Sequence, residues 1–386
     1  MKIVNLKTFV VGAAWRNLIF ILLETDEGTS GCAEATSHNK TMAQLGYLED
    51  VRERYVLGTD PFDTEDLFSR MFRRDYTWAA AVQATAISAI EIACWDIVGK
   101  ALGQPVWRLL GGKCRESIPA YANGWYTVDR DPKLFAERAR AVIAKGYRAL
   151  KFDPFGASGL EISRPERRLA ISLVEAVRDA VGPDVEIFIE AHGRMSPSTA
   201  IAMARELERF DPSWIEEPVP PEDIESLLFV KNHIGIPVAA GERLQTRYGF
   251  RDLIARRAVD ILQPDLIHTG GFLETKKIAA MGEPCFMTVA PHNASGPACT
   301  AASVHLAACM PNFKIQETFD DFSEPWLQEA VRGAPQAQNG CFELPQKPGL
   351  GIELDEEVIS AHPPREGFFN LWGPQWQKRD VMKGAK

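Results

Sequence analysis

From Ile118 to Ile315 the chain alternates short apolar runs with segments long enough to form a helix. Strict alternation of this kind predicts parallel strands joined by helical crossovers. The strand-like runs are 118–122, 149–152, 187–189, 214–215, 238–240, 261–262, 286–289 and Ile315. The helices are expected near Pro132, Pro165, Pro197, Glu222 and Tyr248, after Gly271, and near Gly296. Eight strands predict an α/β fold of the modified TIM type, a (β/α)7β barrel whose last helix is replaced by the C-terminal tail.

An open, doubly wound sheet is also compatible with the alternation alone. Such sheets commonly bind a dinucleotide through a G-x-G-x-x-G turn that follows a strand. No strand-like run in this chain is followed by that turn. This favours the barrel.

The N-terminal part has a different pattern. Residues 1–35 read as three strands with turns between them, and helical patterns dominate 42–110 until Gly111 and Gly112. Strands followed by a block of helices favour an α+β unit. We therefore expect an α+β capping domain over residues 1–117, completed by the tail 325–386, and a catalytic barrel over 118–324.

Charge and cysteine usage exclude some classes of partner. The formal net charge is −9 and no long run of Lys or Arg occurs, which argues against nucleic acid. The N-terminus lacks a signal-peptide pattern and the apolar run 18–23 is too short to span a bilayer, so no membrane partner is expected. Seven cysteines without C-x-x-C spacing predict reduced thiols in the cytoplasm and argue against a zinc site.

The candidate active site lies at the carboxyl ends of the strands, where barrel enzymes place their catalytic groups. The side chains singled out at those ends are all ionisable. They are Lys151, Glu190, His192, Glu216, Glu242, Asp265, His292 and Glu317. Burying such groups is costly unless they pair with one another or bind a metal.

Three of these acids recur in step. The same interval of 26 residues separates Glu190 from Glu216 and Glu216 from Glu242, on the third, fourth and fifth strands. Neighbouring strands lie about 4.8 Å apart, so the three carboxylates can converge on one cation. Oxygen ligands alone favour Mg²⁺, one per subunit. The alternative is that the acids cap helices or pair with Arg194 or Arg243.

His292 and Asp265 end neighbouring strands. A carboxylate beside an imidazole fixes its tautomer and raises its basicity, which predicts a general base. Without such a partner, a histidine that follows Pro291 is more often a structural hydrogen bonder.

Two further strand ends complete the expected site. Lys151 offers a cation for a carboxylate or a developing enolate, unless it is a rim lysine whose ammonium reaches solvent. Glu317 is expected to hydrogen-bond at the substrate carboxylate, and its alternative is an ion pair with Lys314 or a barrel arginine.

With these residues assembled, the chain resembles the mandelate racemase subgroup of the enolase superfamily over essentially its whole length. The matching segments are Ser88–Gly112, Trp214–Pro218 (WIEEP), Gly241–Leu244 (GERL), Ile261–Asp265 (ILQPD) and Lys347–Gly351 (KPGLG). The resemblance implies Mg²⁺ on Glu190, Glu216 and Glu242. It also implies a His292–Asp265 base and Glu317 as a hydrogen-bonding acid.

Two details narrow the resemblance. Racemases of this subgroup carry Lys-x-Lys on the second strand, whereas this chain has Lys151-Phe152-Asp153, so two-sided racemisation is not expected. The segment Glu190–Arg194 (EAHGR) is similar to the galactonate and gluconate dehydratases, which implies His192 as the acid. The runs Tyr121–Tyr126 and Leu150–Gly156 look most like the gluconate dehydratase branch. Asn123 and Asp153 within them are expected to contact the substrate.

The reaction implied is dehydration of a sugar acid such as D-gluconate or D-galactonate. Mg²⁺ and Lys151 would stabilise the enediolate formed when His292 removes the C2 proton. His192 would protonate the departing C3 hydroxyl, and the product would be a 2-keto-3-deoxy acid.

Other functions stay open at this point. The same fold supports dehydratases of aldaric or deoxy-sugar acids, and cycloisomerases. A non-catalytic binding protein would be expected to have lost some of the eight strand-end groups, and none is lost. We expect a homo-oligomer, with distal substrate contacts from Trp15, Arg16, His38 and Trp78 of the cap. Arg16 is the candidate cation for a second substrate carboxylate.

Overall fold

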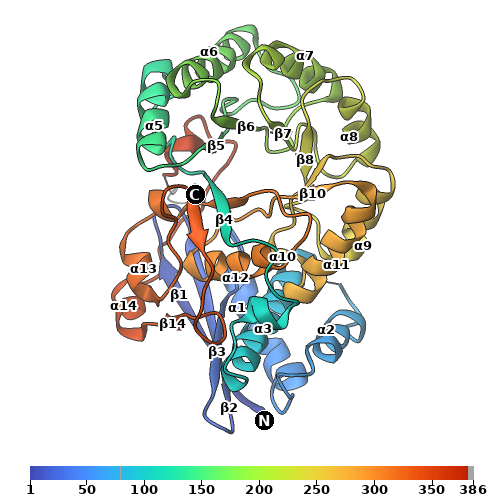
Figure 1. The fold of residues 1–386 in the computed structure, drawn as a ribbon, viewed down its shortest axis with the longest axis vertical. Coiled ribbons are helices and arrows are strands. Elements are labelled where there is room, and N and C mark those ends of the chain that lie inside the picture. The colour runs from blue at the N-terminus through green and yellow to red at the C-terminus, as the bar shows by residue number, and fades with distance from the viewer. Residues whose placement is uncertain (79, 381–386) are drawn as a thin grey trace.

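The computed structural model describes residues 1–78 and 80–380, and it confirms the predicted barrel (Figure 1). The parallel strands are β4 (Ser117–Ala122), β5 (Ala149–Phe152), β6 (Glu186–Glu190), β7 (Trp214–Glu216), β8 (Val238–Ala240), β9 (Ile261–Leu262), β10 (Thr288–Val289) and β11 (Gln316–Thr318). The helices between them are α5 (Pro132–Ala144), α6 (Arg164–Val181), α7 (Pro197–Leu207), α8 (Ile224–Lys231), α9 (Thr246–Ala255), α10 (Leu266–Thr269), α11 (Phe272–Gly282) and α12 (Pro297–Ala308), with the short turns η2 (Glu208–Phe210) and η3 (Glu283–Cys285). Helices α5 to α9 form an arc outside the strands (Figure 1).

The sheet closes on itself. Strands β4 to β10 are neighbours in chain order, and β11 pairs with β4 in parallel. At the remaining edge, the Val289 amide donates to the Asn312 carbonyl at 2.9 Å, and the Lys314 amide donates to the Val289 carbonyl at 2.7 Å. These backbone bonds join the β10 and β11 ends of the series and exclude the open sheet.

Local sequence fixes where several crossover helices begin. Helices α5, α6 and α7 each have a proline in the first turn, where no backbone N–H is needed. The residues before those turns, Asp131, Ser163 and Ser196, accept hydrogen bonds from first-turn amides. Replacing a cap of this kind by alanine costs about 1 kcal/mol.

The barrel interior has an apolar floor beneath a polar layer. The floor is formed by one buried side chain from each strand or from the residue next to it: Tyr121, Ala149, Phe188, Trp214, Ala239, Ile261, Ala290 and Ile315. Side chains on a strand return to the same face every second residue. Two positions further along lie Asn123, Lys151, Glu190, Glu216, Gly241, Gln263, His292 and Glu317. The strand period therefore carries polar groups to the mouth of the barrel.

The fifth strand departs from this period at Gly241. Its φ is 140°, and a Cβ there would lie 2.7 Å from the Phe250 ring. Only glycine fits this close approach. The chain turns at Gly241, and the following residue, Glu242, supplies the acid of this strand.

The predicted seventh strand is wrong at its start. Phe286 is 90% exposed and has φ 62°, because it ends the η3 turn, so the strand begins later, at Thr288. The eighth strand begins at Gln316, one residue after Ile315. The Ile315 side chain still belongs to the barrel floor.

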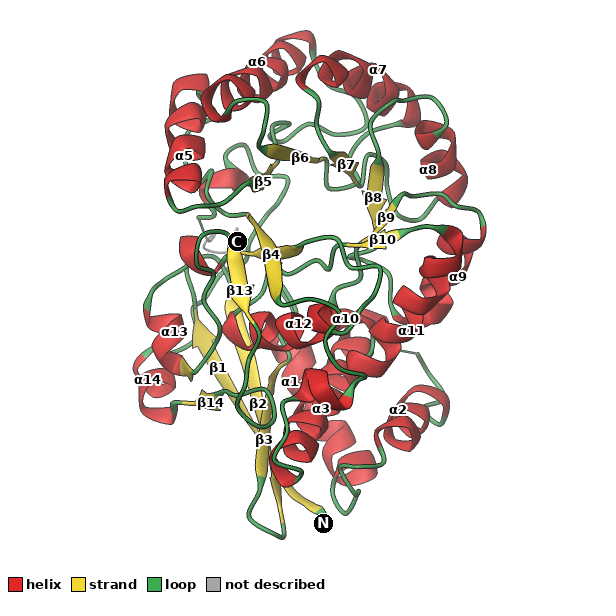
Figure 2. Cartoon of the chain, in the orientation of Figure 1, coloured by secondary structure: helices red, strands yellow, loops and turns green. Residues whose placement is uncertain are grey.

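The N-terminal elements form a three-stranded antiparallel sheet with helices packed against it (Figure 2). The strands are β1 (Ile3–Gly12), β2 (Asn17–Thr25) and β3 (Ser30–Glu34). The helices are α1 (Thr41–Val51), the π-helical turn η1 (Arg52–Val56), α2 (Thr64–Arg73), α3 (Ala80–Ala101) and α4 (Val106–Leu109). This matches the predicted α+β unit.

Helix α3 is long and apolar enough, by length and composition, to cross a membrane. However, 83% of its most apolar window is buried inside the protein. It packs against β2, β3, α1, α2 and α10. This burial is typical of an apolar helix in the core of a folded domain.

The C-terminal tail contacts both parts of the protein. Its elements are η4 (Asp320–Phe322), α13 (Trp326–Ala330), β12 (Val331–Arg332), β13 (Cys341–Glu343), β14 (Glu353–Leu354), α14 (Glu356–Ala361) and η5 (Trp376–Lys378). Strand β13 pairs antiparallel with β4 of the barrel, whereas the Gly12 amide of β1 donates to the His362 carbonyl. The predicted boundary at residue 117, with the tail assigned to the cap, stays a prediction.

Candidate active site

The carboxylates of Glu190, Glu216 and Glu242 meet on one side of the barrel mouth. Glu190 is paired with Glu216 in the β6–β7 register, and one oxygen from each of the three lies within 4.8 Å of the others. Burial and the charge of Glu216 raise the pKa of Glu190 well above its ordinary value. Carboxylates held this close repel one another unless a cation joins them. Their hard oxygen donors fit a divalent cation such as Mg²⁺.

The arginines that could have paired with these acids have other partners. Arg194 Nη1 lies 2.6 Å from Asp153, and Arg243 Nη2 lies 2.5 Å from Glu217. Gln263, which was not among the predicted site residues, donates to Glu216 at 2.6 Å and holds one of its oxygens in place. The acidic cluster is therefore not explained as a set of arginine ion pairs.

Lys151 lies among four acidic or phenolic groups below the mouth. Its Nζ is 2.6 Å from Glu216, 3.0 Å from Glu317 and 3.5 Å from Glu190. Burial alone lowers the pKa of Lys151, but these carboxylates and Tyr121 raise it well above its ordinary value. Its 2% side-chain exposure excludes a rim lysine that reaches solvent.

Asp265 and His292 form the pair that the sequence predicted. A parallel backbone bridge joins them, and His292 Nδ1 lies 2.7 Å from Asp265 Oδ2. Asp265 accepts this hydrogen bond, so Nδ1 keeps its hydrogen and Nε2 is the nitrogen that gains or loses a proton. Nε2 points at Glu242, 3.3 Å away. Burial lowers the pKa of His292, but Glu242 and Asp265 outweigh it and raise the value to about 10. A cation on Glu242 would oppose the larger of these two raising influences.

His192 has an aspartate of its own. It adopts φ 50° directly beyond β6, where its amide donates to Glu190 at 2.5 Å and its Nδ1 lies 2.5 Å from Asp153 Oδ2. Asp153 Oδ1 accepts a bond from the Phe155 amide. Burial raises the pKa of Asp153, but Arg194 and His192 outweigh it and hold the value below its ordinary range. Both oxygens of Asp153 have partners within the protein, and its expected contact with substrate stays a prediction.

Glu317 of β11 is held by a network of hydrogen bonds. It accepts bonds from the Asn123 side chain at 2.7 Å and the Asn293 amide at 2.9 Å. Lys314, the alternative partner, reaches Glu186 instead. Asn123 therefore positions Glu317, and its expected contact with substrate stays a prediction.

Family models cover most of the chain. One described as "Enolase C-terminal domain-like" matches residues 134–358. One described as "Mandelate racemase / muconate lactonizing enzyme, N-terminal domain" matches residues 6–111. The chain belongs to the enolase superfamily. Its mandelate racemase and muconate lactonizing enzyme branch is the one that the sequence motifs resembled.

Curated relatives within the superfamily are named as sugar-acid dehydratases. A D-gluconate dehydratase of Thermoproteus tenax is 37% identical over 91% of this chain and 71% of its own length. A D-gluconate/D-galactonate dehydratase of Picrophilus torridus is 38% identical, over 89% of this chain and 88% of its own. A solved mandelate racemase/muconate lactonizing enzyme structure from Sulfitobacter superposes with a TM-score of 0.91 at 31% identity, over 100% of this chain and 99% of its own.

In this superfamily member, three of the four cap residues predicted to contact substrate lie together. Trp15 and Arg16 occupy the loop between β1 and β2, and His38 follows β3. Trp15 stacks on His38 with ring centroids 5.4 Å apart, and the Arg16 guanidinium lies 3.9 Å above the Trp15 ring. Arg16 also donates to the Ser295 carbonyl, in the loop after β10, at 3.0 Å. The cap therefore reaches the barrel mouth through this loop.

Trp78 lies in a separate aromatic cluster. It is 41% exposed and meets Phe72 of α2 edge-on, with centroids 4.9 Å apart. Phe72 in turn stacks on Tyr248 of α9 at 5.5 Å. The substrate contact of Trp78 stays a prediction.

The tail contributes residues that were not predicted from the sequence. The Trp376 ring lies edge-on to His192, 5.2 Å away, and its Nε1 donates to the Gly156 carbonyl at 2.9 Å. Arg379 lies over the rings of Phe319 and Trp15, at 4.5 Å and 5.2 Å. These residues follow a proline-broken segment without periodicity, so no local signal in the sequence points to them.

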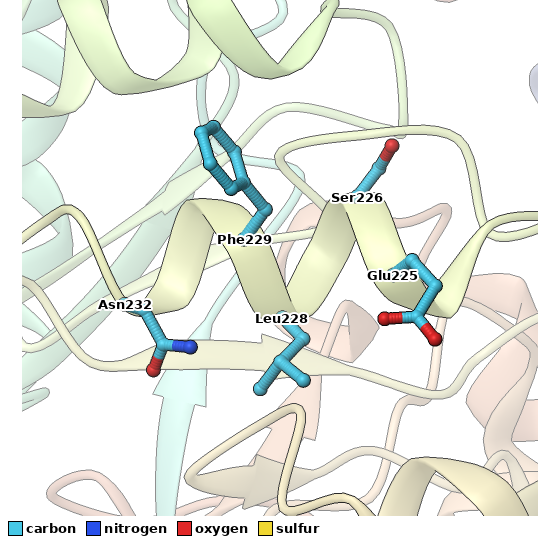
Figure 3. A pocket seen from close by; sticks show the side chains of 5 residues that line it. All are labelled: Glu225, Ser226, Leu228, Phe229 and Asn232. Carbon is cyan, nitrogen blue, oxygen red and sulfur yellow. The ribbon is translucent and has the colours of Figure 1, made fainter.

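A hollow on the outside of the barrel has few side chains that could act in catalysis (Figure 3). It is lined by Glu225, Ser226, Leu228, Phe229 and Asn232 of α8 and the turn after it. Phe229 and Leu228 project from opposite sides of the helix (Figure 3). None of these five residues comes from a strand end. The chemistry-bearing groups are concentrated at the barrel mouth.

Proposed function

We propose that this protein catalyses the Mg²⁺-dependent dehydration of a sugar acid to its 2-keto-3-deoxy product, with D-gluconate and D-galactonate as the first substrates. One observation carries the proposal. Two imidazoles, each held by its own aspartate, flank the three-carboxylate cluster: His292 with Asp265, and His192 with Asp153. An elimination needs one group that removes a proton and a second that donates one. The names of the relatives favour the same reaction.

Glu190, Glu216 and Glu242 would hold the metal ion. When bound, Mg²⁺ supplies a Lewis acid that lowers the pKa of the hydrogen on the carbon beside the substrate carboxylate. His292 Nε2 takes that C2 proton, while Asp265 stabilises the imidazolium that results. Lys151 opposes the negative charge that develops on the carboxylate oxygens.

The second half of the reaction uses the other histidine. His192, held through Nδ1 by Asp153, gives the proton that leaves with the C3 hydroxyl as water. The C3–O bond breaks and the C2–C3 enol forms, which then tautomerises to the ketone. The net change is the loss of one water molecule. Because both Asp153 oxygens are occupied, we assign Asp153 to the positioning of His192.

We further propose that the cofactor is Mg²⁺, with one ion per subunit. We also propose that the protein is a cytoplasmic homo-oligomer without nucleic-acid or membrane partners. The acidic cluster supports a divalent ion, and one ion per subunit follows from the one cluster found in the described chain.

Turnover of aldonates tests the proposed function. We expect purified protein with Mg²⁺ to convert D-gluconate or D-galactonate into a 2-keto-3-deoxy acid, followed by NMR or a carbonyl-specific assay. No racemisation at C2 is expected, because the position two residues after Lys151 is an aspartate bound to His192. Aldonates that are all inert while other acid classes react would reject this choice of substrate.

Asp153→Asn tests the positioning role. The change preserves shape but removes the charge that orients His192, so we expect dehydration to fall by about 10²- to 10⁴-fold, the usual contribution of a positioned general acid. Exchange of the C2 hydrogen with solvent deuterium should persist, because His292 is untouched. Asp131→Asn, at the N-terminus of α5, is the control, since asparagine caps a helix as well as aspartate does. Loss of exchange together with dehydration, in a folded Asp153→Asn protein, would contradict the assignment.

A further inference from the structure

Two arginines from distant parts of the chain meet at the barrel mouth. Arg16 comes from the loop between β1 and β2, and Arg379 directly follows η5 in the tail. Each is only 8% exposed. Both guanidinium groups lie over the same two rings: Arg16 is 3.9 Å from Trp15 and 5.9 Å from Phe319, and Arg379 is 5.2 Å and 4.5 Å from them.

Neither arginine forms an ion pair with an acid of the described chain. Among the described residues, no carboxylate oxygen lies within 4.0 Å of either guanidinium group. Arg16 donates through Nη2 to Ser295, while its Nε and Nη1 are buried without a hydrogen-bond partner in the described chain. Burial, together with the charge of Arg379, lowers the pKa of Arg16 to about 9 against the pull of Glu34. Buried cations without a counter-ion are costly, so the pair favours an anion.

Glu34 raises the pKa of Arg16 more than any other acid, but it is held by hydrogen bonds to other groups. Glu34 accepts bonds from the backbone amides of Gly296 and Cys299 and from the Thr36 hydroxyl. It caps the first turn of α12 and is held there by these bonds. Glu34 and the buried Asp320 therefore act on Arg16 from beyond ion-pair distance, and no described acid contacts either guanidinium group directly.

The pair lies across the mouth from the acidic cluster. A Cβ on Gly124 would lie 3.0 Å from Arg379 Nη1, which places this guanidinium beside the end of β4. Arg16 is bonded to Ser295, whose amide donates to Asn293, and the Asn293 amide donates to Glu317 on β11. In the strand order of the barrel, β4 and β11 face β8 and β7, which carry acids of the metal cluster. A sugar acid held by its carboxylate at the cluster would extend toward the arginines.

The chemistry of the pair selects the group that would bind there. A guanidinium is a planar fork that bonds a carboxylate with two parallel N–H donors. Arg16 lies 3.9 Å from the Trp15 ring centroid, and Arg379 lies 5.6 Å from that of Tyr126 and 4.5 Å from that of Phe319, so cation–π contacts help to hold both groups. A neutral terminal hydroxyl could accept one bond, but it would leave both guanidinium groups without a direct ion-pair partner.

We propose that the substrate range extends to sugar diacids, whose second carboxylate binds between Arg16 and Arg379. This inference rests on the proposed function, since it concerns the far end of the same substrate site. It keeps D-gluconate and D-galactonate as substrates and expects the aldaric acids of matching stereochemistry to react with a higher kcat/KM.

The test compares matched pairs of acids, D-gluconate with D-glucarate and D-galactonate with galactarate. We expect kcat/KM of the diacid to exceed that of the monoacid by about tenfold or more, because a charge-assisted hydrogen bond replaces a neutral one. Arg16→Met and Arg379→Met should each lower this diacid-to-monoacid ratio by about tenfold or more. Lys378→Met, which removes the neighbouring tail cation paired with Asp129, is the control and should keep the ratio. An unchanged ratio in both arginine variants would overturn the proposal.

A binding measurement separates this inference from the proposed function. Calorimetry with Mg²⁺-loaded His292→Asn protein should show tighter binding of D-glucarate than of D-gluconate, and adding Arg16→Met should remove the difference. If the parent protein turns over neither class, the proposed function fails, and calorimetry still decides for or against the arginine pair. A larger advantage for 6-phosphogluconate than for D-glucarate would assign the pair to a phosphate and overturn the diacid.

Discussion

Dehydration by this enzyme is expected to stop in excess EDTA and to return when Mg²⁺ is added beyond the chelator. The physical reason is the crowding of Glu190, Glu216 and Glu242, whose oxygens converge within 4.8 Å of one another. With no metal, Lys151 is the cation that contacts Glu190 and Glu216, and it cannot provide the open coordination positions that a substrate oxygen needs. Turnover measured across a Mg²⁺ titration checks the expectation. Full activity in excess chelator would contradict the metal assignment.

Single substitutions locate the metal more sharply. Glu216→Gln should weaken Mg²⁺ binding by at least about 100-fold, since even partners outside the ligand shell cost about 10- to 100-fold. This glutamine would also place an amide against the donors Trp214 and Gln263, so its folding must be checked by thermal denaturation. Glu242→Gln is the cleaner variant, because Glu242 contacts His292 and lacks those donors.

The matched control for these two variants is Glu274→Gln. Glu274 is a buried acid that belongs to an ion pair with Arg247 and to no acidic cluster among the described residues. Calorimetric titration with Mg²⁺ should show parent-like affinity for it. Equal losses in Glu274→Gln and Glu242→Gln would indicate a general effect of removing a buried charge, and would contradict a metal site at Glu242.

Much of the barrel and of its site could be predicted because side chains on a strand return to the same face every second residue. Each floor residue, such as Phe188 or Trp214, is apolar, and the residue two positions later is Glu190 or Glu216. This alternation alone is enough to place the acids at the strand ends. The Asp265–His292 pair follows in the same way, because neighbouring strands end at the same edge.

The remainder could not be predicted because it depends on contacts between distant segments. Nothing near Arg379 or Trp376 in the sequence indicates that the tail returns to the barrel mouth. Asp153 lies at the expected strand end, but its contact with His192 could not be predicted, because it also involves Arg194, one unit further along the barrel. Phe286 shows the converse error, since a local apolar run suggested a strand where a tight turn leaves the side chain exposed.

His292→Asn and His192→Asn are expected to separate the two proton transfers. His292→Asn should lower dehydration by about 10²- to 10⁴-fold, the usual contribution of a general base or acid. It should also abolish exchange of the C2 hydrogen with solvent deuterium, because His292 is the imidazole that Asp265 holds by a hydrogen bond. His192→Asn should lower dehydration to a similar extent and keep the exchange, since His292, Asp265 and the metal ligands are intact. Deuterium incorporation into recovered substrate, followed by NMR, distinguishes the two variants.

The two imidazoles are held independently, so each substitution tests one proton transfer. His292 is fixed by Asp265 and His192 by Asp153, and these two hydrogen bonds share no residue. Removal of one imidazole therefore leaves the other with its own aspartate. His233→Asn, on the outside of the barrel after α8, controls for the chemistry of the substitution. Dehydration at the parent rate in His192→Asn would remove His192 from the mechanism. Persistent C2 exchange in His292→Asn would move the base elsewhere, and Lys151, 2.6 Å from Glu216, would be the first residue to test.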